Sequence, residues 1–516
     1  MSELNKDVIF LILKNLQNDS KSFYSCLLIN RIWCETVVPI LWKNPSRHQL
    51  TENACKILLS VILSHLSGES KDNMMNQGID IFTETYQRPL FNYISFWKHL
   101  DSKFLEFIMN VFVKDKNIEL SKISIIRDEI LNLFNLNTTF NSLSIKSIPK
   151  LSYLISGTEL YFSKLDHFYC DSNTNSNFLG GLALTNTSIK KLGFNIMVHT
   201  NNYLGIIKLI KVQKNLKEVN FIYNHLRISN ELCHKSLEES LINCENTIQY
   251  LRIDWKPITN FLSNLINLVS LYIINSCYDY TNWNHLEKVS LPLLKFLKTH
   301  QISSWILACL IKNTKGNLIE INIHYQDVDD GRLLKAISQN CPKLCYLKLS
   351  SFNSNTLDFE NLLINCQSLI GLQIIGIYGC FIDWDKLFET LAKFSPFSLF
   401  KFKFKFSFSW QYKLKALKLF LNNWNDRNPI LLQIISTEHT YIERQQQQQL
   451  EDLFQIYKEK GIIKKYDLEN PNNISYDDFE WIQKKDLKKN KERNLGPRKK
   501  GGEGKPDPVF LKEAPY

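Results

Sequence analysis

One short hydrophobic pattern recurs through this chain of 516 residues and limits how it can fold. Each copy has an apolar residue, two residues of any kind, a second apolar residue, one residue of any kind and a third apolar residue. Successive copies begin 20 to 32 residues apart, and the weakest has Thr299 in its third position. A repeat of about 25 residues predicts a solenoid, because each unit can bury its apolar face only against its neighbours. The eleven copies begin at Phe140, Leu165, Ile189, Leu216, Ile248, Leu268, Leu294, Leu318, Leu344, Leu369 and Leu399.

The pattern resembles the leucine-rich repeat, which has one strand and one helix or 3₁₀ segment per turn. Asparagine-cysteine pairs at Asn243-Cys244, Asn340-Cys341 and Asn365-Cys366 precede three copies, as in the cysteine-containing subclass of that repeat. We interpret these cysteines as small buried packing residues. A metal site is not expected, because Cys341 and Cys345 lack a second ligand pair. No cofactor is expected either.

The segments that flank the clearest copies predict further elements. Residues 50–137 lack the pattern but contain CKILLSVILSHL and LFNYISFWKHL, which indicate a helical linker or degenerate first repeats. FKFKFKFSFSW at 400–410 alternates perfectly and predicts a long strand near the C-terminal end, with lysines that protect a sheet edge. An amphipathic helix, the strand LLQII and a capping helix from the glutamine run onwards are expected to follow.

The first 45 residues predict three short helices. The first runs from Leu4 to Leu16 with Asn5 as its cap, and the second begins near Ser20. The third carries Trp33 and ends before Pro39. Helices this short cannot bury all their apolar side chains against one another, so something else must cover part of the surface.

The order and spacing of these residues, up to the final Leu41-Trp42, resemble an F-box. Asn5 stands where the family usually has proline, and both residues suit the start of a helix. The resemblance implies that the segment docks on a Skp-type adaptor and so joins a cullin-RING ubiquitin ligase. The alternative is a small helical cap that packs on the next domain. The expected adaptor-binding residues are Leu4, Val8, Ile9, Ile12, Leu13, Leu16, Leu27, Trp33, Leu41 and Trp42.

Residues between the apolar strand positions should point to the concave face of a horseshoe-shaped solenoid. In the second half of the repeats these residues are basic and polar, which favours an acidic or phosphorylated protein segment as the substrate. The alternative is that the lysines are simply solvated. The expected substrate-binding residues are Arg252, Tyr272, Lys298, His300, Asn322, His324, Lys348, Gln373, Lys403 and Lys405.

The net charge of +11 is concentrated near the C-terminus, where residues 484–505 hold ten Lys or Arg and three acids. This tail is expected to be disordered, and it could be a nuclear import signal, a nucleic-acid patch or a plain solvated tail. Because the tail lacks interleaved aromatic residues, we expect no nucleic-acid partner. The longest uncharged run, Pro257 to Tyr278, contains four asparagines, so no membrane span is expected. The absence of a secretory signal and of paired cysteine spacing favours a cytoplasmic or nuclear protein.

Together these patterns predict an α/β chain in four parts. An F-box at 1–45 is followed by a helical linker or degenerate repeats at 46–137, a leucine-rich-repeat solenoid with its cap at 138–466 and a basic tail at 467–516. No phosphate-binding loop, dinucleotide fingerprint, nucleophile elbow or HExxH motif is present, so we expect no catalytic residues and no enzyme activity. The expected function is substrate recognition for a Skp-cullin-F-box ubiquitin ligase. The alternative is a repeat scaffold without a ligase role.

Overall fold

A computed structural model describes thirteen segments of the chain: residues 4–16, 20–47, 50–79, 89–145, 162–196, 203–223, 231–274, 283–324, 331–350, 356–376, 382–406, 414–436 and 444–469. These segments form two compact units, Met1–Leu344 and Cys345–Tyr516, which we describe separately as the first and the second unit. Both units are mixed α/β. Phe408 and Trp410 of the alternating segment lie outside the described residues, as does the predicted tail from residue 470 onwards.

The first unit begins with a bundle of short helices, α1 (Lys6–Leu16), α2 (Ser20–Ser25), the 3₁₀ helix η1 (Cys26–Leu28) and α3 (Arg31–Trp42). The predicted cap at Asn5 is confirmed, because its Oδ1 accepts a hydrogen bond from the backbone N–H of Asp7 at 3.3 Å. The prediction that the third helix ends before Pro39 is wrong. Proline removes one backbone hydrogen bond, but the neighbouring Val37 and Val38 are buried, and their packing supports the last turn.

The next segment contains α4 (Glu52–Ser64), α5 (Gly68–Asn76), α6 (Tyr93–Phe96), β1 (His99–Asp101), α7 (Ser102–Asp115), η3 (Leu120–Lys122) and α8 (Ile123–Asn137). The helix predicted near residues 55–66 is confirmed. The prediction that all of residues 90–100 are helical is wrong, because β1 follows the four-residue α6. The N–H of Lys98 donates to the carbonyl of Lys43 at 3.0 Å, which holds this stretch extended. Since β1 pairs with β2, the sheet begins before the first recognisable repeat.

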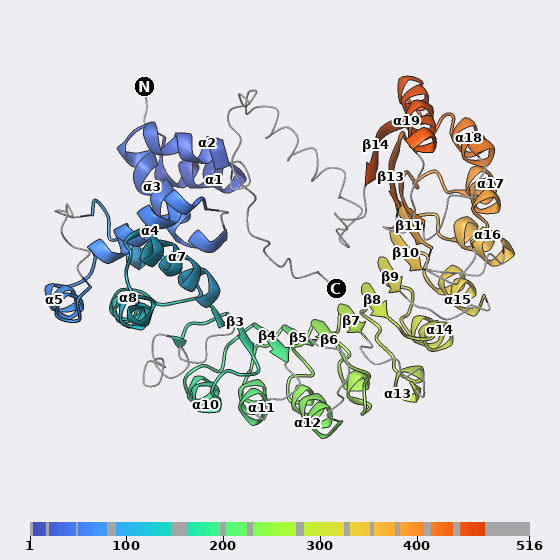
Figure 1. The fold of residues 1–516 in the computed structure, drawn as a ribbon. Coiled ribbons are helices and arrows are strands. Elements are labelled where there is room, and N and C mark those ends of the chain that lie inside the picture. Colours follow the sequence, from blue (N-terminus) through green and yellow to red (C-terminus); the bar gives the residue numbers. More distant parts are fainter. Residues whose placement is uncertain are drawn as a thin grey trace. The chain divides into compact units, whose positions relative to one another are not determined.

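The repeats of the first unit supply the remaining strands and helices of its sheet. Each strand pairs in parallel with the next one along the chain. The described helices lie on one side of these strands (Figure 1). We call the opposite side, without described helices, the strand face. The strands are β2 (Ser142–Ile145), β3 (His167–Asp171), β4 (Lys191–Ile196), β5 (Glu218–Tyr223), β6 (Tyr250–Ile253), β7 (Ser270–Ile274), β8 (Phe296–His300) and β9 (Glu320–His324). The helices are α10 (Ser176–Thr185), α11 (Tyr203–Lys211), α12 (Glu231–Ile242), η5 (Phe261–Asn264), α13 (Asn284–Glu287), α14 (Ser304–Lys312) and α15 (Arg332–Asn340).

The second unit continues the same alternation with β10 (Tyr346–Ser350), α16 (Thr356–Asn365), β11 (Gly371–Ile375), α17 (Trp384–Phe394), β12 (Lys401–Phe406), α18 (Leu414–Asn422), β13 (Ile430–Ser436), α19 (Arg444–Glu459) and β14 (Ile463–Glu469). Its strands are also parallel and paired in chain order. The prediction that the alternating segment is an edge strand is wrong, because β12 pairs with both β11 and β13. The sequence analysis missed β14, which follows the predicted capping helix α19.

The apolar residues of the repeat form the core of both units. The central residues of successive copies are opposite one another in the sheet, as Leu271 is opposite Leu297 and Leu372 opposite Phe402, and all four are buried. The packing role of the corner cysteines is also confirmed. Cys244 is buried, and its Sγ lies 3.5 Å from the carbonyl oxygens of Ile210 and Gln213 in the preceding repeat. Burial raises the pKa of the equivalent Cys366 to about 12, so this thiol stays protonated.

Candidate functional site

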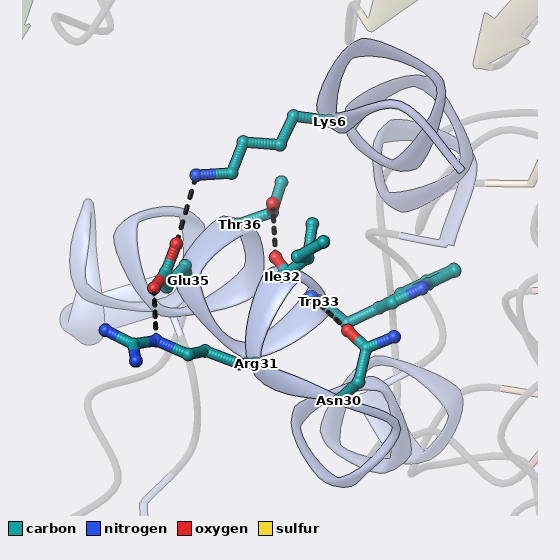
Figure 2. A network of polar contacts seen from close by, with 7 residues as sticks. All are labelled: Lys6, Asn30, Arg31, Ile32, Trp33, Glu35 and Thr36. Carbon is teal, nitrogen blue, oxygen red and sulfur yellow. Dashed lines mark hydrogen bonds and ion pairs between the residues drawn. The ribbon is translucent and has the colours of Figure 1, made fainter. Parts of the chain in front are cut away.

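The helices of the N-terminal bundle are joined by a small polar network (Figure 2). Glu35 of α3 accepts from Lys6 Nζ of α1 at 3.0 Å and from Arg31 Nε at 2.9 Å. The hydrogen bond from Lys6, followed by that from Arg31, lowers the pKa of Glu35. Asn30 caps α3, since its Oδ1 accepts from the N–H of Trp33 at 3.0 Å. These contacts fix how α1 and α3 present their outer side chains.

The predicted adaptor-binding residues of the bundle fall into three groups, which are buried, exposed or partly buried. Ile9 and Leu13 are fully buried in its core, so they offer no surface to a partner. Leu4 and Val8 are exposed, at 48% and 41%. A third group is partly buried and packs against the core: Leu16, Leu27, Trp33 and Leu41, and Ile12 is partly buried as well.

Four further apolar side chains are exposed in the bundle but were missed by the sequence analysis. Phe10 and Leu11 lie on α1 and are 50% and 59% exposed, while Leu28 and Ile29 lie between α2 and α3 and are 89% and 54% exposed. Their exposure could not be read from the sequence, because apolar residues surround α1 almost completely. We call the six residues Leu4, Val8, Phe10, Leu11, Leu28 and Ile29 the exposed apolar residues of the bundle.

The two tryptophans of the bundle have different surroundings. Trp42 packs against the segment that follows, with its ring centroid 4.5 Å from that of Tyr93 and 6.3 Å from that of Trp97. Trp42 therefore helps to join α3 to α6, and its contact with a partner stays a prediction. Trp33 is half-buried at the edge of the three-helix core.

The residues predicted to share one face of the repeats do lie in one row of each unit. The pairing places Tyr169 opposite Gly193, Arg252 opposite Tyr272, and Lys298 opposite Asn322. In the second unit it places Lys348 opposite Gln373 and Gln373 opposite Lys403. The repeat pattern alone therefore located the candidate binding residues correctly along the strands.

On the strand face of the first unit, charged side chains pair with carboxylates of the same unit. Lys191 Nζ lies 2.7 Å from Glu218 Oε2. Arg252 donates to both carboxylate oxygens of Asp254, at 3.0 Å each. Burial raises the pKa of Asp254, although Arg252 and the N–H of Tyr223 favour its charged form.

Aromatic rings also lie on this face. Arg252 and Lys298 both approach the ring of Tyr272, with the guanidinium carbon 4.6 Å and the ammonium nitrogen 4.5 Å from its centroid. The imidazoles of His300 and His324 stack with centroids 4.5 Å apart. Tyr169 lies across Gly193, where an added Cβ would come within 2.1 Å of the ring. The side chains at these three places on the face are therefore closely packed.

The strand face of the second unit is richer in lysine. The alternative that the lysines are simply solvated is wrong for two of them, because Lys348 is 5% exposed and Lys403 is 3% exposed. Burial also lowers the pKa of Lys405. The pairing puts lysines at positions 348, 401, 403, 405 and 465 on this face, with Asp467 of β14 as an acid among the described side chains. Asp467 accepts from Gln433 Nε2 at 3.1 Å.

Within the described segments, no group of three or more His, Cys, Asp or Glu side chains could hold a metal ion. Nor is any helix of those segments long and apolar enough to cross a membrane. No known family model matches the chain, and no curated protein matches it.

Proposed function

We propose that this chain is a substrate-recognition subunit of a Skp-cullin-F-box ubiquitin ligase that works in the cytoplasm or nucleus. The N-terminal bundle is the adaptor-docking segment, and the strand faces of the repeats bind a protein target. This role requires no cofactor and no catalytic residue in the chain itself. The chain would act by holding a target near the conjugating machinery, which raises the effective concentration of the reacting groups.

The exposed apolar residues of the bundle are the observation that carries the proposal. Six large apolar side chains, each at least 41% exposed, lie within the first 29 residues. Covering a Leu or Phe side chain completely contributes about 1.5–3 kcal/mol, so a partner that covers several of them gains substantial binding free energy. The polar network around Glu35 holds α1 and α3 together without a partner, which suits a preformed docking surface.

A binding experiment with surface variants tests the docking role. Leu11→Asp with Leu28→Asp should abolish co-purification of the full chain with a Skp-type adaptor, because two carboxylates would be desolvated at the interface. Both leucines are exposed, so the bundle should remain folded, as its circular dichroism would verify. Leu13 is unsuitable for this test because it belongs to the core.

Leu184→Asp is the matched control. Leu184 lies on α10 and is 87% exposed, so the substitution makes the same chemical change outside the bundle. It should leave adaptor binding unchanged. Failure of the unmodified chain to bind the adaptor would instead favour a repeat scaffold without a ligase role.

The target-binding role is tested by charge reversal on the strand faces. Lys298→Glu in the first unit and Lys348→Glu with Lys403→Glu in the second should each weaken binding of an acidic or phosphorylated target segment. If target binding is unchanged in both variants, the acidic-substrate assignment is wrong, even where the adaptor still binds.

A further inference from the structure

Three large apolar side chains are exposed among the strand residues that the structure describes. They are Ile222 on β5, Tyr250 on β6 and Phe296 on β8, which are 36%, 42% and 37% exposed. Each alternates with buried core residues along its strand, so each lies on the strand face of the first unit, opposite the helices (Figure 1). This part of the strand face therefore offers apolar area to a partner.

Two of these residues stand on either side of a serine. The pairing places Tyr250 opposite Ser270 on β7, and Ser270 opposite Phe296. We call Tyr250 and Phe296 the aromatic pair. Within the described part of the chain, neither of its rings contacts another aromatic ring. Because serine is small, no side chain of similar size lies between the two rings.

The spacing of the strands suits a third ring above Ser270. Neighbouring strands are about 4.8 Å apart, so β6 and β8 are about 9.6 Å apart. A ring that packs against two others at centroid distances of about 4.5–7 Å needs those two to be about 9–14 Å apart. The backbone positions of the aromatic pair therefore match the width of one inserted aromatic side chain.

Charged side chains around the aromatic pair balance one another. Glu218 lies beside Tyr250 in the pairing and forms an ion pair with Lys191. A charged group placed between the two rings would lose its hydration without meeting a net opposite charge, so the balance favours an uncharged occupant. On the strand face from β4 to β9, basic and acidic side chains are equal in number: Lys191, Arg252 and Lys298, and Glu218, Asp254 and Glu320.

We propose that Tyr250, Ser270 and Phe296 form a recognition site for one uncharged aromatic side chain of an extended protein segment. The rings of the aromatic pair contact the two faces of the inserted ring, and Ser270 lies beneath it. The site rests on the proposed target-binding role and deepens it, because it specifies an aromatic residue in the target.

Disulfide exchange at Ser270→Cys tests which chemistry this position accepts, without any adaptor or target. The full-length variant is equilibrated with small disulfides that carry a phenyl, an ammonium or a carboxylate group on the same linker, in competition with 2-mercaptoethanol. Mass spectrometry of the peptide that contains position 270 measures the fraction modified. We expect the phenyl compound to be retained about tenfold more strongly than the other two, because each ring contact contributes about two- to tenfold.

Variants of the aromatic pair supply the matched controls. Adding Tyr250→Ser and Phe296→Ser to Ser270→Cys should remove the phenyl preference, since the thiol stays the same and only the rings are lost. Adding Tyr250→Phe should keep the preference, because the ring remains. Both aromatic residues are exposed, so the variants should remain folded, as circular dichroism would verify.

A selection of short random peptides on the full-length chain tests recognition of a protein segment. We expect the selected peptides to share an aromatic residue and to bind the variant Tyr250→Ser, Phe296→Ser about tenfold more weakly. Leu184→Ser is the control, because it removes an exposed apolar side chain of α10 from outside the strand face. It should leave the peptide affinity unchanged.

Three results would overturn the proposal. One is equal retention of the phenyl, ammonium and carboxylate compounds, and another is strongest retention of the ammonium compound, which would assign a cationic ligand to the aromatic pair. The third is a selection whose peptides lack an aromatic residue or do not distinguish the chain from the variant without the rings. None of these results depends on adaptor binding, so the aromatic site can fail while the ligase role stands, and the reverse also holds.

Discussion

The strand faces of the two units neutralise their charges in different ways. In the first unit, Lys191 pairs with Glu218 and Arg252 with Asp254, each within the same face. In the second unit, the lysines of β10 and β12 outnumber the described carboxylates, yet Lys348 and Lys403 are buried. The same repeat architecture thus supports one face that carries ion pairs of its own and another that is rich in lysine.

This difference assigns different roles to the two faces. Removing one member of a buried ion pair destabilises the fold, and a ligand can use a paired charge only by breaking the pair. A lysine-rich face favours an acidic segment that reaches it. We therefore expect substitutions of the paired charges in the first unit to change mainly stability, and substitutions of the lysines in the second to change mainly binding.

The largest expected effect is that of Asp254→Ala in the first unit. It leaves Arg252 without its carboxylate and removes the acceptor of the Tyr223 N–H, so the free energy of unfolding should fall by about 3–5 kcal/mol. The matched change in the second unit, Lys403→Met, should cost less than about 1 kcal/mol, because methionine keeps the apolar contacts of the lysine stem without a buried charge. Urea unfolding followed by circular dichroism measures both, and equal losses would contradict the comparison.

Gly193→Ala should destabilise the first unit by about 1–3 kcal/mol, because the new methyl group would overlap the ring of Tyr169. Adding Tyr169→Ala should restore most of the lost stability. Gly180 on α10 is the control, since an added Cβ there meets no atom within 4 Å and alanine favours a helix. Thermal unfolding of the four proteins measures these effects, and a lack of rescue would show that Tyr169 is not the cause.

The first unit should also lose stability as the pH falls from 7 to 5. Burial lowers the pKa of His234 to about 4, so the unfolded chain binds a proton near pH 6.5 that the folded chain does not. The free energy of unfolding is unaffected by this group above pH 7 and is about 2 kcal/mol lower at pH 5. Burial raises the pKa of Glu238, so this carboxyl adds stability as the pH falls and opposes the effect of His234. The measurement therefore needs a reference variant that lacks His234.

His234→Phe supplies that reference, because phenylalanine can keep the stacking on Trp255 that the imidazole makes at 4.8 Å. Urea midpoints at pH 7 and pH 5 should differ less in this variant than in the unmodified chain. An unchanged difference would mean that His234 does not control this pH dependence.

The smallest expected effects come from one lysine on each face. Lys191→Gln should change stability by no more than about 1 kcal/mol, because its pair with Glu218 is partly exposed, and should leave acidic-peptide binding unchanged. Lys405→Gln should weaken binding of an acidic peptide to the second unit about two- to fivefold. If the two substitutions affect peptide binding equally, the distinction between the faces is wrong.

Several elements of the fold could be predicted from particular residues. The triplet around Leu347 and Leu349 located a strand because each of its apolar side chains must be buried on one side of a sheet. Cys244 was correctly placed in a corner, since a small thiol beside a chain reversal suits tight packing. The helix through Pro39 and the strand β1 were not predicted, because tertiary contacts of Val37, Val38 and Lys98 override their local signals.

The candidate sites were predicted less completely than the fold. Sequence pattern grouped Ile9, Leu13 and Trp42 with a docking surface, but the packing of the bundle buried the first two and turned Trp42 toward Tyr93. Phe10 and Leu28 were missed because an apolar residue on a short helix can face either the core or the solvent. Only the arrangement of the three helices distinguishes these possibilities.

The sequence by itself determined the parallel strands, their order and the row of residues on each strand face, because the period of the repeat and the alternation of a strand are local properties. The tertiary structure decided which apolar side chains are exposed, which charges are paired and which lysines are buried. Those outcomes depend on contacts between residues far apart in the chain, as Arg127 shows by pairing with Glu106 and Tyr223 by bonding to Asp254. Burial and charge pairing depend on which residues surround a side chain in the folded protein. The position of a residue in the repeat does not specify those neighbours.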